Sequence, residues 1–441
     1  MTKMLAVMAL LVAVVLVVMA PLGAQVSAGL ALLLLAGTLW MTEAMPVTIT
    51  ALLVPVLAAL LGVLPVKEAL ANFAHPIIFL FLGGFALASA LKEQGLDKAM
   101  ASAVMRLAGG RVWLSVLLLF ITSAFLSMWI SNTATTAMML PLALGLLSGM
   151  EPAPSPGTRI FVLLGIAYSA SLGGMGTLVG SPPNAIAAGY LGYQFDDWLA
   201  LGLPLMLILL PLAWGVLFWQ LRPALAARSE PQQGVAFEWS RGRLLTMVVF
   251  AATVLCWIFS SLLSKALGGI KDFDALVALS ATVLVGALGL SSWKAIERDV
   301  DWGVLLLFGG GMTLSAVLKV TGTSAWLAHG LSSLTTGAPV WLLYGLIAAF
   351  VVFLTELASN TASAALLVPL FGGIAGALGL PVQSMAVLIA LAASCAFMLP
   401  VATPPNAIVF GSGMVPQRVM MRTGLWLNLL AIVVLTLVFG F

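Results

Sequence analysis

The chain has 441 residues, of which 62% are hydrophobic and 7% are charged, and its formal net charge is +3. Soluble domains carry about 25% charged residues, so this composition excludes a soluble globular protein. The few basic residues sit in short loops, where they set membrane topology, so they do not indicate a nucleic-acid partner.

Apolar runs of the length that crosses a bilayer recur from end to end of the chain. They predict membrane spans at roughly 4–20, 26–45, 47–64, 76–108, 159–190, 198–221, 243–264, 274–290, 302–334, 382–413 and 423–440. The runs are continuous rather than alternating, which indicates helices and excludes a β-barrel. The sequence therefore predicts an all-α polytopic membrane protein with about eleven transmembrane helices.

Two further apolar stretches, 113–149 and 339–376, carry the same small polar cluster near their middles. SNTATTAMMLP begins at Ser131, and SNTASAALLVP begins at Ser359. Each arm is short for a full crossing at about 1.5 Å per residue. We expect both stretches to be re-entrant hairpins with the Ser-Asn-Thr cluster at the tip.

Other segments of the two halves also match, in the same order. FLGGFALASALKEQG (81–95) resembles FGGGMTLSAVLKVTG (308–322), and GSPPNAIAAG (180–189) resembles ATPPNAIVFG (402–411). Such self-similarity indicates a duplicated unit. Because an odd number of predicted spans separates the copies, we expect one copy to be inverted, which is typical of secondary transporters.

The predicted organisation follows from this repeat. N-terminal helices occupy 1–46, the first repeat 47–221 with a cytoplasmic-side hairpin at 113–149, a cytoplasmic linker 222–243, and the second repeat 244–441 with an outer-side hairpin at 339–376. With the N-terminus in the cytoplasm and the C-terminus outside, only Lys67, Lys265, Lys271 and Lys319 of the 18 basic residues face outward. This bias agrees with the positive-inside rule for a multi-pass protein of the cell (plasma) membrane.

The polar clusters have the chemistry of a cation site. Pro182-Pro183 and Pro404-Pro405 must break their helices, and the carbonyls before each break need new partners. The hairpin tips add hydroxyl and amide oxygens, and Ser127 and Thr355 stand one turn before them. These ligands are neutral and hard, so they suit Na⁺ better than a transition metal. We expect a cation to take up carbonyls at each break.

The same segments can bind an anion. The helices that follow the tips direct their N-termini at the site, and helix N-termini bind anions. No Lys or Arg lies within either hairpin or break. A dianion there needs co-bound cations to balance its charge, which predicts a carrier dependent on cations.

Two other classes of membrane protein, a channel and an enzyme, fit the sequence less well. A channel needs a continuous polar lining, whereas this chain offers discrete polar breaks. A membrane enzyme is disfavoured because HExxH, GxSxG and intramembrane acid pairs are missing from the sequence. Glu356, inside TELASNT, has two open roles, either carrying a proton or shaping a cation site, or capping structure.

At these motifs the sequence resembles the divalent anion:sodium symporter family, over essentially the whole chain. The resemblance implies a homodimer whose subunits have a scaffold domain and a transport domain that moves like an elevator. It implies sodium held around Ser127, Ser131, Asn132 and Gly180, and around Thr355, Ala358, Asn360 and Ala402. It implies substrate carboxylates at Asn132, Thr133, Ser181, Ser359, Asn360, Thr361, Thr403 and Pro404. C4-dicarboxylates such as succinate, malate or fumarate are the expected substrates of a sodium symporter, with tricarboxylates or sulfate, exchange or proton coupling as alternatives.

Overall fold

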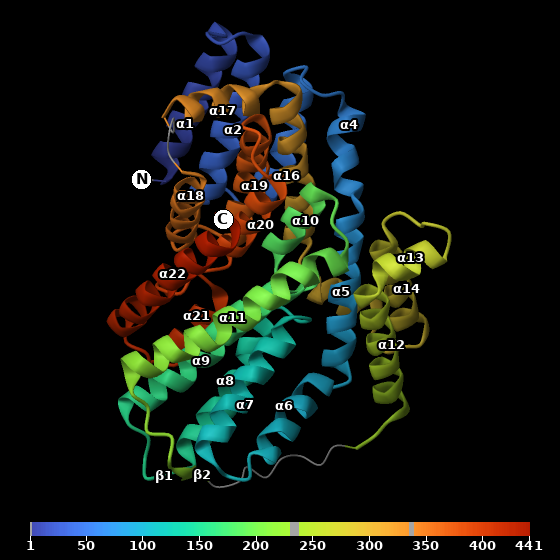
Figure 1. Cartoon of the computed structure of the whole chain (residues 1–441). Helices are drawn as coiled ribbons and strands as arrows, with labels where there is room; N and C mark the ends of the chain where they lie inside the picture. The colour runs from blue at the N-terminus through green and yellow to red at the C-terminus, as the bar shows by residue number, and fades with distance from the viewer. Residues whose placement is uncertain (1, 230–237, 335–338) are drawn as a thin grey trace.

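The computed structural model describes residues 2–229, 238–334 and 339–441. The first half contains α1 (Thr2–Met19), α2 (Ala24–Thr42), α3 (Val47–Leu60), α4 (Val66–Ala71), the short 3₁₀ helix η1 (Asn72–Ala74), α5 (Pro76–Glu93), α6 (Leu96–Leu107), α7 (Val112–Ser127), α8 (Asn132–Ser148), β1 (Met150–Glu151), α9 (Pro156–Gly173), η2 (Gly174–Gly176), η3 (Leu178–Gly180), α10 (Pro182–Leu191) and α11 (Phe195–Leu221). Figure 1 shows how these helices are arranged.

The second half begins with β2 (Arg228–Ser229), which pairs with β1 in an antiparallel ladder. It continues with α12 (Arg241–Ile258), α13 (Ser260–Ala266), α14 (Phe273–Ala287), α15 (Trp293–Asp299), α16 (Trp302–Val320), α17 (Thr323–Leu334), α18 (Val340–Thr355), α19 (Asn360–Ala377), α20 (Val382–Ala393), α21 (Pro404–Gly411) and α22 (Gln417–Phe439). Part of the predicted linker 222–243 lies outside the described residues, and its end already belongs to α12.

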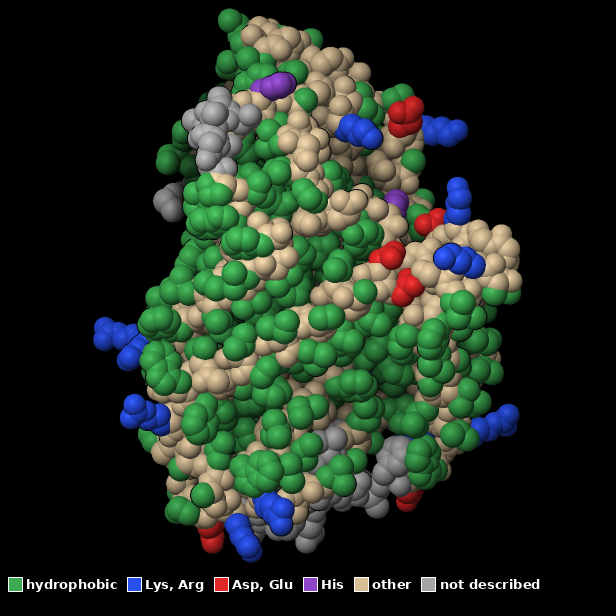
Figure 2. Space-filling model, viewed as in Figure 1, with side chains coloured by type: hydrophobic (Ala, Val, Ile, Leu, Met, Phe, Trp, Pro, Cys, Tyr) green, Lys and Arg blue, Asp and Glu red, His purple; other side chains and the backbone are tan. Residues whose placement is uncertain are grey.

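The helices form a membrane protein, as the composition predicts. Among the described residues, eight helices are long and apolar enough to cross a bilayer. The face in Figure 2 is covered broadly by hydrophobic side chains, and Lys and Arg lie mainly near its edges and ends. Such a surface is stable against lipid but not against water. The all-α polytopic fold is therefore confirmed.

The span predicted at 243–264 divides at Phe259 into α12 and α13, and two further predicted spans divide at a glycine. The span predicted at 76–108 ends with α5 and restarts as α6 after Gly95, whose φ is +62°. The span predicted at 302–334 divides in the same way between α16 and α17 at Gly322, whose φ is +71°. Glycine adopts this left-handed conformation without a Cβ clash, so it ends helices. Figure 1 places α17 near the top and α6 near the bottom of the molecule.

The segments that carry the motifs pack across the two halves. Helices α7 and α8 meet at the first Ser-Asn-Thr cluster, and α18 and α19 meet at the second. Helix α10, after the first double proline, packs on α19 and α20, whereas α21, after the second, packs on α8 and α9. Each break therefore lies beside the hairpin of the other half, which brings all four motifs together.

Candidate functional site

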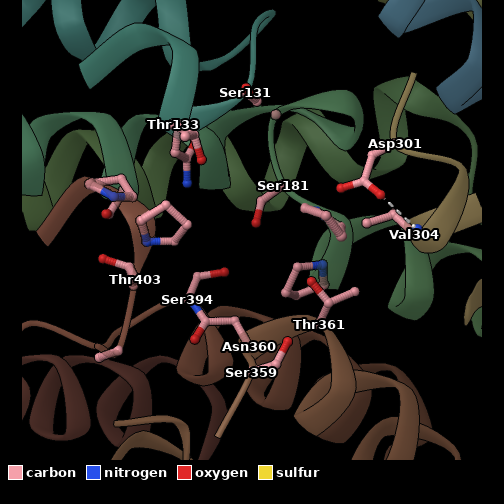
Figure 3. Close-up of a pocket in the computed structure, with 18 of the residues that line it drawn as sticks. Ser131, Thr133, Ser181, Asp301, Val304, Ser359, Asn360, Thr361, Ser394 and Thr403 are labelled. Carbon is pink, nitrogen blue, oxygen red and sulfur yellow. Dashed lines mark hydrogen bonds between the residues drawn. The ribbon is translucent and has the colours of Figure 1, made fainter. Parts of the chain in front are cut away.

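A cavity of about 760 Å³ lies where the four motifs meet. Figure 3 shows Ser131 and Thr133 on one side of it and Ser359, Asn360 and Thr361 on the opposite side. Ser181 and Thr403 come from the two breaks and lie between the tips. The volume is within the usual range of small-molecule sites.

Four helices begin at this cavity. Helices α8 and α19 start at the tips, capped by the hydroxyls of Ser131 and Ser359, which accept hydrogen bonds from Ala134 N and Ala362 N. Helices α10 and α21 start at the double prolines, after Ser181 and Thr403. The first backbone N–H groups of α8 and α19 have no partner within their own helix. The dipoles of converging helix N-termini favour an anion at these positions without a basic side chain.

Each tip also holds a close pair of oxygen atoms. The Ser127 hydroxyl donates to Asn132 Oδ1 at 2.5 Å, and the Thr355 hydroxyl donates to Asn360 Oδ1 at 2.6 Å. Thr355 and Ser127 are fully buried behind the tips. The two copies thus offer the same neutral oxygen donors, which are the ligands that Na⁺ prefers.

Side chains take up some of the carbonyls around the breaks, which leaves the carbonyls of Gly180 and Ala402 for the expected cations. Asn184 Nδ2 donates to Gly174 O at 2.8 Å and to Thr177 O at 2.7 Å. In the second half, Asn406 Nδ2 donates to the carbonyls of residues 396 and 399 at 3.2 and 3.0 Å. The asparagine of each Pro-Pro-Asn motif therefore stabilises the unwound segment before it.

Replacing Asn184 or Asn406 by alanine is expected to destabilise the protein, because two carbonyls lose their donor each time and only that of Leu399 is partly exposed. An unsatisfied buried polar group costs about 1–3 kcal/mol. A thermal unfolding curve in detergent should therefore shift clearly to lower temperature for either variant. Gln417→Ala removes an exposed amide as a control and should leave the midpoint unchanged. Equal midpoints for all three variants would contradict this role.

The side chain of Glu356 is hydrogen-bonded to the backbone of the second break. Its carboxylate accepts hydrogen bonds from the backbone N–H groups of Phe397, Met398 and Leu399 at 2.7–2.9 Å. Asn428 Nδ2 of α22 donates to it at 2.7 Å. These four contacts favour the capping role among the two that the sequence left open.

The charges that line the cavity are all negative. The described lining residues include Glu43, Asp299 and Asp301, and none of them is a lysine or arginine. Asp301 caps α16 by accepting from Val304 N at 3.1 Å, and Asp299 forms an ion pair with Lys92. An anion in this cavity therefore meets helix ends and neutral donors rather than a basic side chain.

Comparison with known proteins agrees with this geometry. The family model described as "Citrate transporter" matches residues 37–392 and 275–441. An "Uncharacterized transporter" of Haemophilus influenzae is 53% identical over 94% of this chain and 91% of its own length. The "Sodium-dependent dicarboxylate transporter SdcS" of Staphylococcus saprophyticus is 32% identical over 93% of this chain and 85% of its own length.

The chain belongs to the citrate transporter family. The match to sodium-dependent dicarboxylate carriers confirms the resemblance to the divalent anion:sodium symporters. The fold of the transporter is also similar to the crystal structure of the YdaH transporter from Alcanivorax borkumensis, with a TM-score of 0.61 at 15% identity, over 85% of this chain and 87% of the other. The protein is therefore a membrane transporter and not an enzyme.

The transporter's predicted site residues lie together. All the predicted substrate-binding residues line the cavity, namely Asn132, Thr133, Ser181, Ser359, Asn360, Thr361, Thr403 and Pro404. Of the predicted cation ligands, Ser131, Asn132, Gly180, Ala358, Asn360 and Ala402 line it as well. Ser127 and Thr355 lie behind it, in contact with Asn132 and Asn360.

Three buried hydroxyls near the site were missed by sequence reasoning. Ser171 lines the cavity at 2% exposure, and its Oγ has no hydrogen-bond partner in the described part of the chain. The hydroxyls of Thr135 and Ser363, one turn beyond the tips, are buried without a described partner as well. Thr135 and Ser363 occupy the same place in the two copies, and a hydroxyl shared by both copies is the sequence signal that would have identified them.

Proposed function

We propose that the transporter is a sodium-coupled symporter that imports C4-dicarboxylates such as succinate, malate or fumarate. One observation carries this proposal: the described lining of the central cavity holds helix N-termini, neutral oxygens and three carboxylates, but no basic side chain. A dicarboxylate bound there requires bound cations beside it, because burial of an unbalanced charge is costly. The sodium-dependent dicarboxylate relatives support the same substrate and ion.

The two ion positions follow from the oxygen donors. One Na⁺ is held around Ser127, Ser131, Asn132 and Gly180, and the other around Thr355, Ala358, Asn360 and Ala402. The substrate carboxylates then accept hydrogen bonds at the N-termini of α8 and α19 and from the hydroxyls of Ser181 and Thr403. The alanines take part through their backbone carbonyls only. Because Asn132 and Asn360 belong to both sets, ion and substrate stabilise each other, which is the physical basis of coupling.

We further propose that the N-terminus is cytoplasmic and the C-terminus external in the inner (plasma) membrane. The inverted repeat supports alternating access, with the transport part moving as an elevator within a homodimer. The matching contacts of the two motif copies support this symmetry, because each tip and each break is built from the same interactions.

Radiolabelled succinate uptake into proteoliposomes tests the function. An inward Na⁺ gradient should drive accumulation, and replacement of Na⁺ by K⁺ or choline should reduce it to the level of empty vesicles. Accumulation driven by a proton gradient without Na⁺ would overturn sodium coupling. Uptake that requires internal dicarboxylate would identify an exchanger instead of a symporter.

Competition in the same assay defines the substrate class. Unlabelled malate and fumarate should inhibit succinate uptake more strongly than citrate or sulfate at equal concentration. The tricarboxylate alternative draws on the family's description as citrate transporters. Stronger inhibition by citrate would favour that alternative over the C4-dicarboxylate.

A further inference from the structure

A second cavity of about 750 Å³ lies between η1 and the helices α10, α16, α17, α19 and α20. Its polar lining residues are Asn72, His75, Tyr190, Lys319, Ser324 and Gln383, together with Ser315. Unlike the central cavity, it has a lysine and no carboxylate among its described lining residues. The two cavities therefore carry opposite charges in their walls.

The sequence repeat relates the walls of the two cavities. Phe85 and Ala88 of α5 line the central cavity, and residues 227 positions later, Met312 and Ser315 of α16, line the second one. By the same offset, Lys319 corresponds to Lys92. The second cavity is thus lined by positions of α16 that correspond to the positions of α5 lining the central cavity.

In the first copy, the lysine is neutralised. Lys92 Nζ lies 2.9 Å from Asp299 Oδ1, and Arg298 also contacts this carboxylate. Partial burial raises the pKa of Asp299, but the hydrogen bonds from Arg298 and Lys92 outweigh it and hold the pKa below its usual value. The carboxylate is therefore ionised at neutral pH and balances Lys92.

In the second copy, the corresponding acid is missing. Asn72 stands 227 positions before Asp299, and its amide donates to Thr313 Oγ1 at 3.2 Å. An amide cannot neutralise an ammonium group, and Lys319 has no carboxylate within 4.0 Å among the described residues. Lys319 is exposed to the cavity as an uncompensated positive charge.

Hydrogen-bond donors line the same cavity as this charge. His75 Nδ1 accepts from Ile77 N at 3.3 Å, so a neutral imidazole carries its proton on Nε2 and offers it as a donor. The side chains of Tyr190, Ser324 and Gln383 add further donors in the lining. A lysine ammonium with several neutral donors is the combination that binds a carboxylate.

We propose that the second cavity is a capture site for the carboxylate substrate, in which Lys319 forms the ion contact. This proposal rests on the proposed function for the identity of the anion, a small dicarboxylate. In the proposed topology the site faces outward, so it raises the local concentration of the dianion before the substrate reaches the sodium-containing centre. The acidic wall of the central cavity does not retain the anion after its cations have left. Lys319 therefore favours arrival of the dianion, and the carboxylates of the central cavity favour its release.

Chemical protection of Lys319 tests capture without requiring transport. The purified wild-type protein is treated in Na⁺-free buffer with an amine-reactive acetylating reagent, and the modification of each lysine is followed by mass spectrometry. Succinate should slow the modification of Lys319 and leave Lys271 unchanged, whereas acetate at matched ionic strength should protect neither. Equal rates at Lys319 with succinate and with acetate would overturn the capture site.

Uptake kinetics give a second test of the capture site. Lys319→Gln should raise KM for succinate about three- to tenfold at low ionic strength, less at high ionic strength, and leave kcat unchanged. Lys319→Arg should restore KM, and the matched control Lys271→Gln should match the wild type. Identical KM values for Lys319→Gln and Lys271→Gln would refute the proposal. If succinate protects Lys319 but the wild-type protein takes up no succinate, the proposed function alone is refuted.

Discussion

Replacing Asn132 or Asn360 by alanine is expected to lower sodium-driven succinate uptake about 100-fold or more while the protein stays folded. In the proposed mechanism the side-chain oxygen of each asparagine contacts a cation, and each asparagine begins the helix whose N-terminus binds a carboxylate. Losing two interactions with charged groups costs about 3 kcal/mol or more, which corresponds to this factor. Initial uptake rates in proteoliposomes measure the effect.

A matched variant separates the two roles of this residue. Asn132→Asp keeps an oxygen for the cation but adds a negative charge beside the substrate, so we expect Na⁺ binding to survive and succinate binding to be lost. Thermal unfolding with and without Na⁺ shows whether the ion still binds and stabilises the fold. Uptake like that of the wild type in Asn132→Ala or Asn360→Ala would remove the paired motif from the mechanism.

Glu356→Ala is expected to have the largest effect on stability. The change leaves the buried Phe397 N–H and Asn428 amide, and the partly buried N–H groups of Met398 and Leu399, without their acceptor. At about 1–3 kcal/mol for each of the two buried groups, the loss is at least about 2 kcal/mol. Thermal unfolding in detergent should show a much lower midpoint, or the protein should fail to accumulate.

Glu356→Gln keeps the fold testable if the alanine variant does not fold. One amide oxygen still accepts, whereas the new NH₂ group faces donors, so we expect a midpoint between those of Glu356→Ala and the wild type. Asn428→Ala removes one donor from outside the break and should have a smaller effect. A stable Glu356→Gln variant that loses all pH dependence of uptake would instead support the proton-carrying role.

The sequence predicted which segments meet at the cavity better than it predicted the helices around it. The two Ser-Asn-Thr clusters and the double prolines identified the segments that meet at the cavity. Polar residues inside a membrane are energetically costly, so they usually mark a functional site. The divisions at Gly95 and Gly322 were missed because the apolar composition continues through both. Composition alone does not show where a glycine adopts a left-handed conformation and redirects the chain.

Local sequence patterns could not predict which groups form hydrogen bonds with the buried polar side chains. Asn428 lies 72 residues from Glu356, and Trp198 and Tyr168 donate to the carbonyls of Met175 and Phe397 at the two breaks. These contacts depend on how α11, α9 and α22 pack, which a single sequence does not specify. Local patterns also did not show that Asn184 and Asn406 donate to carbonyls at the breaks.

A high-resolution structure of the protein with succinate and Na⁺ tests the central claim most directly. We predict ion density between Ser127 and Asn132 and between Thr355 and Asn360, with the two carboxylates at the N-termini of α8 and α19. Succinate held in the central cavity by a lysine or arginine, with no ion density at either tip, would contradict the account.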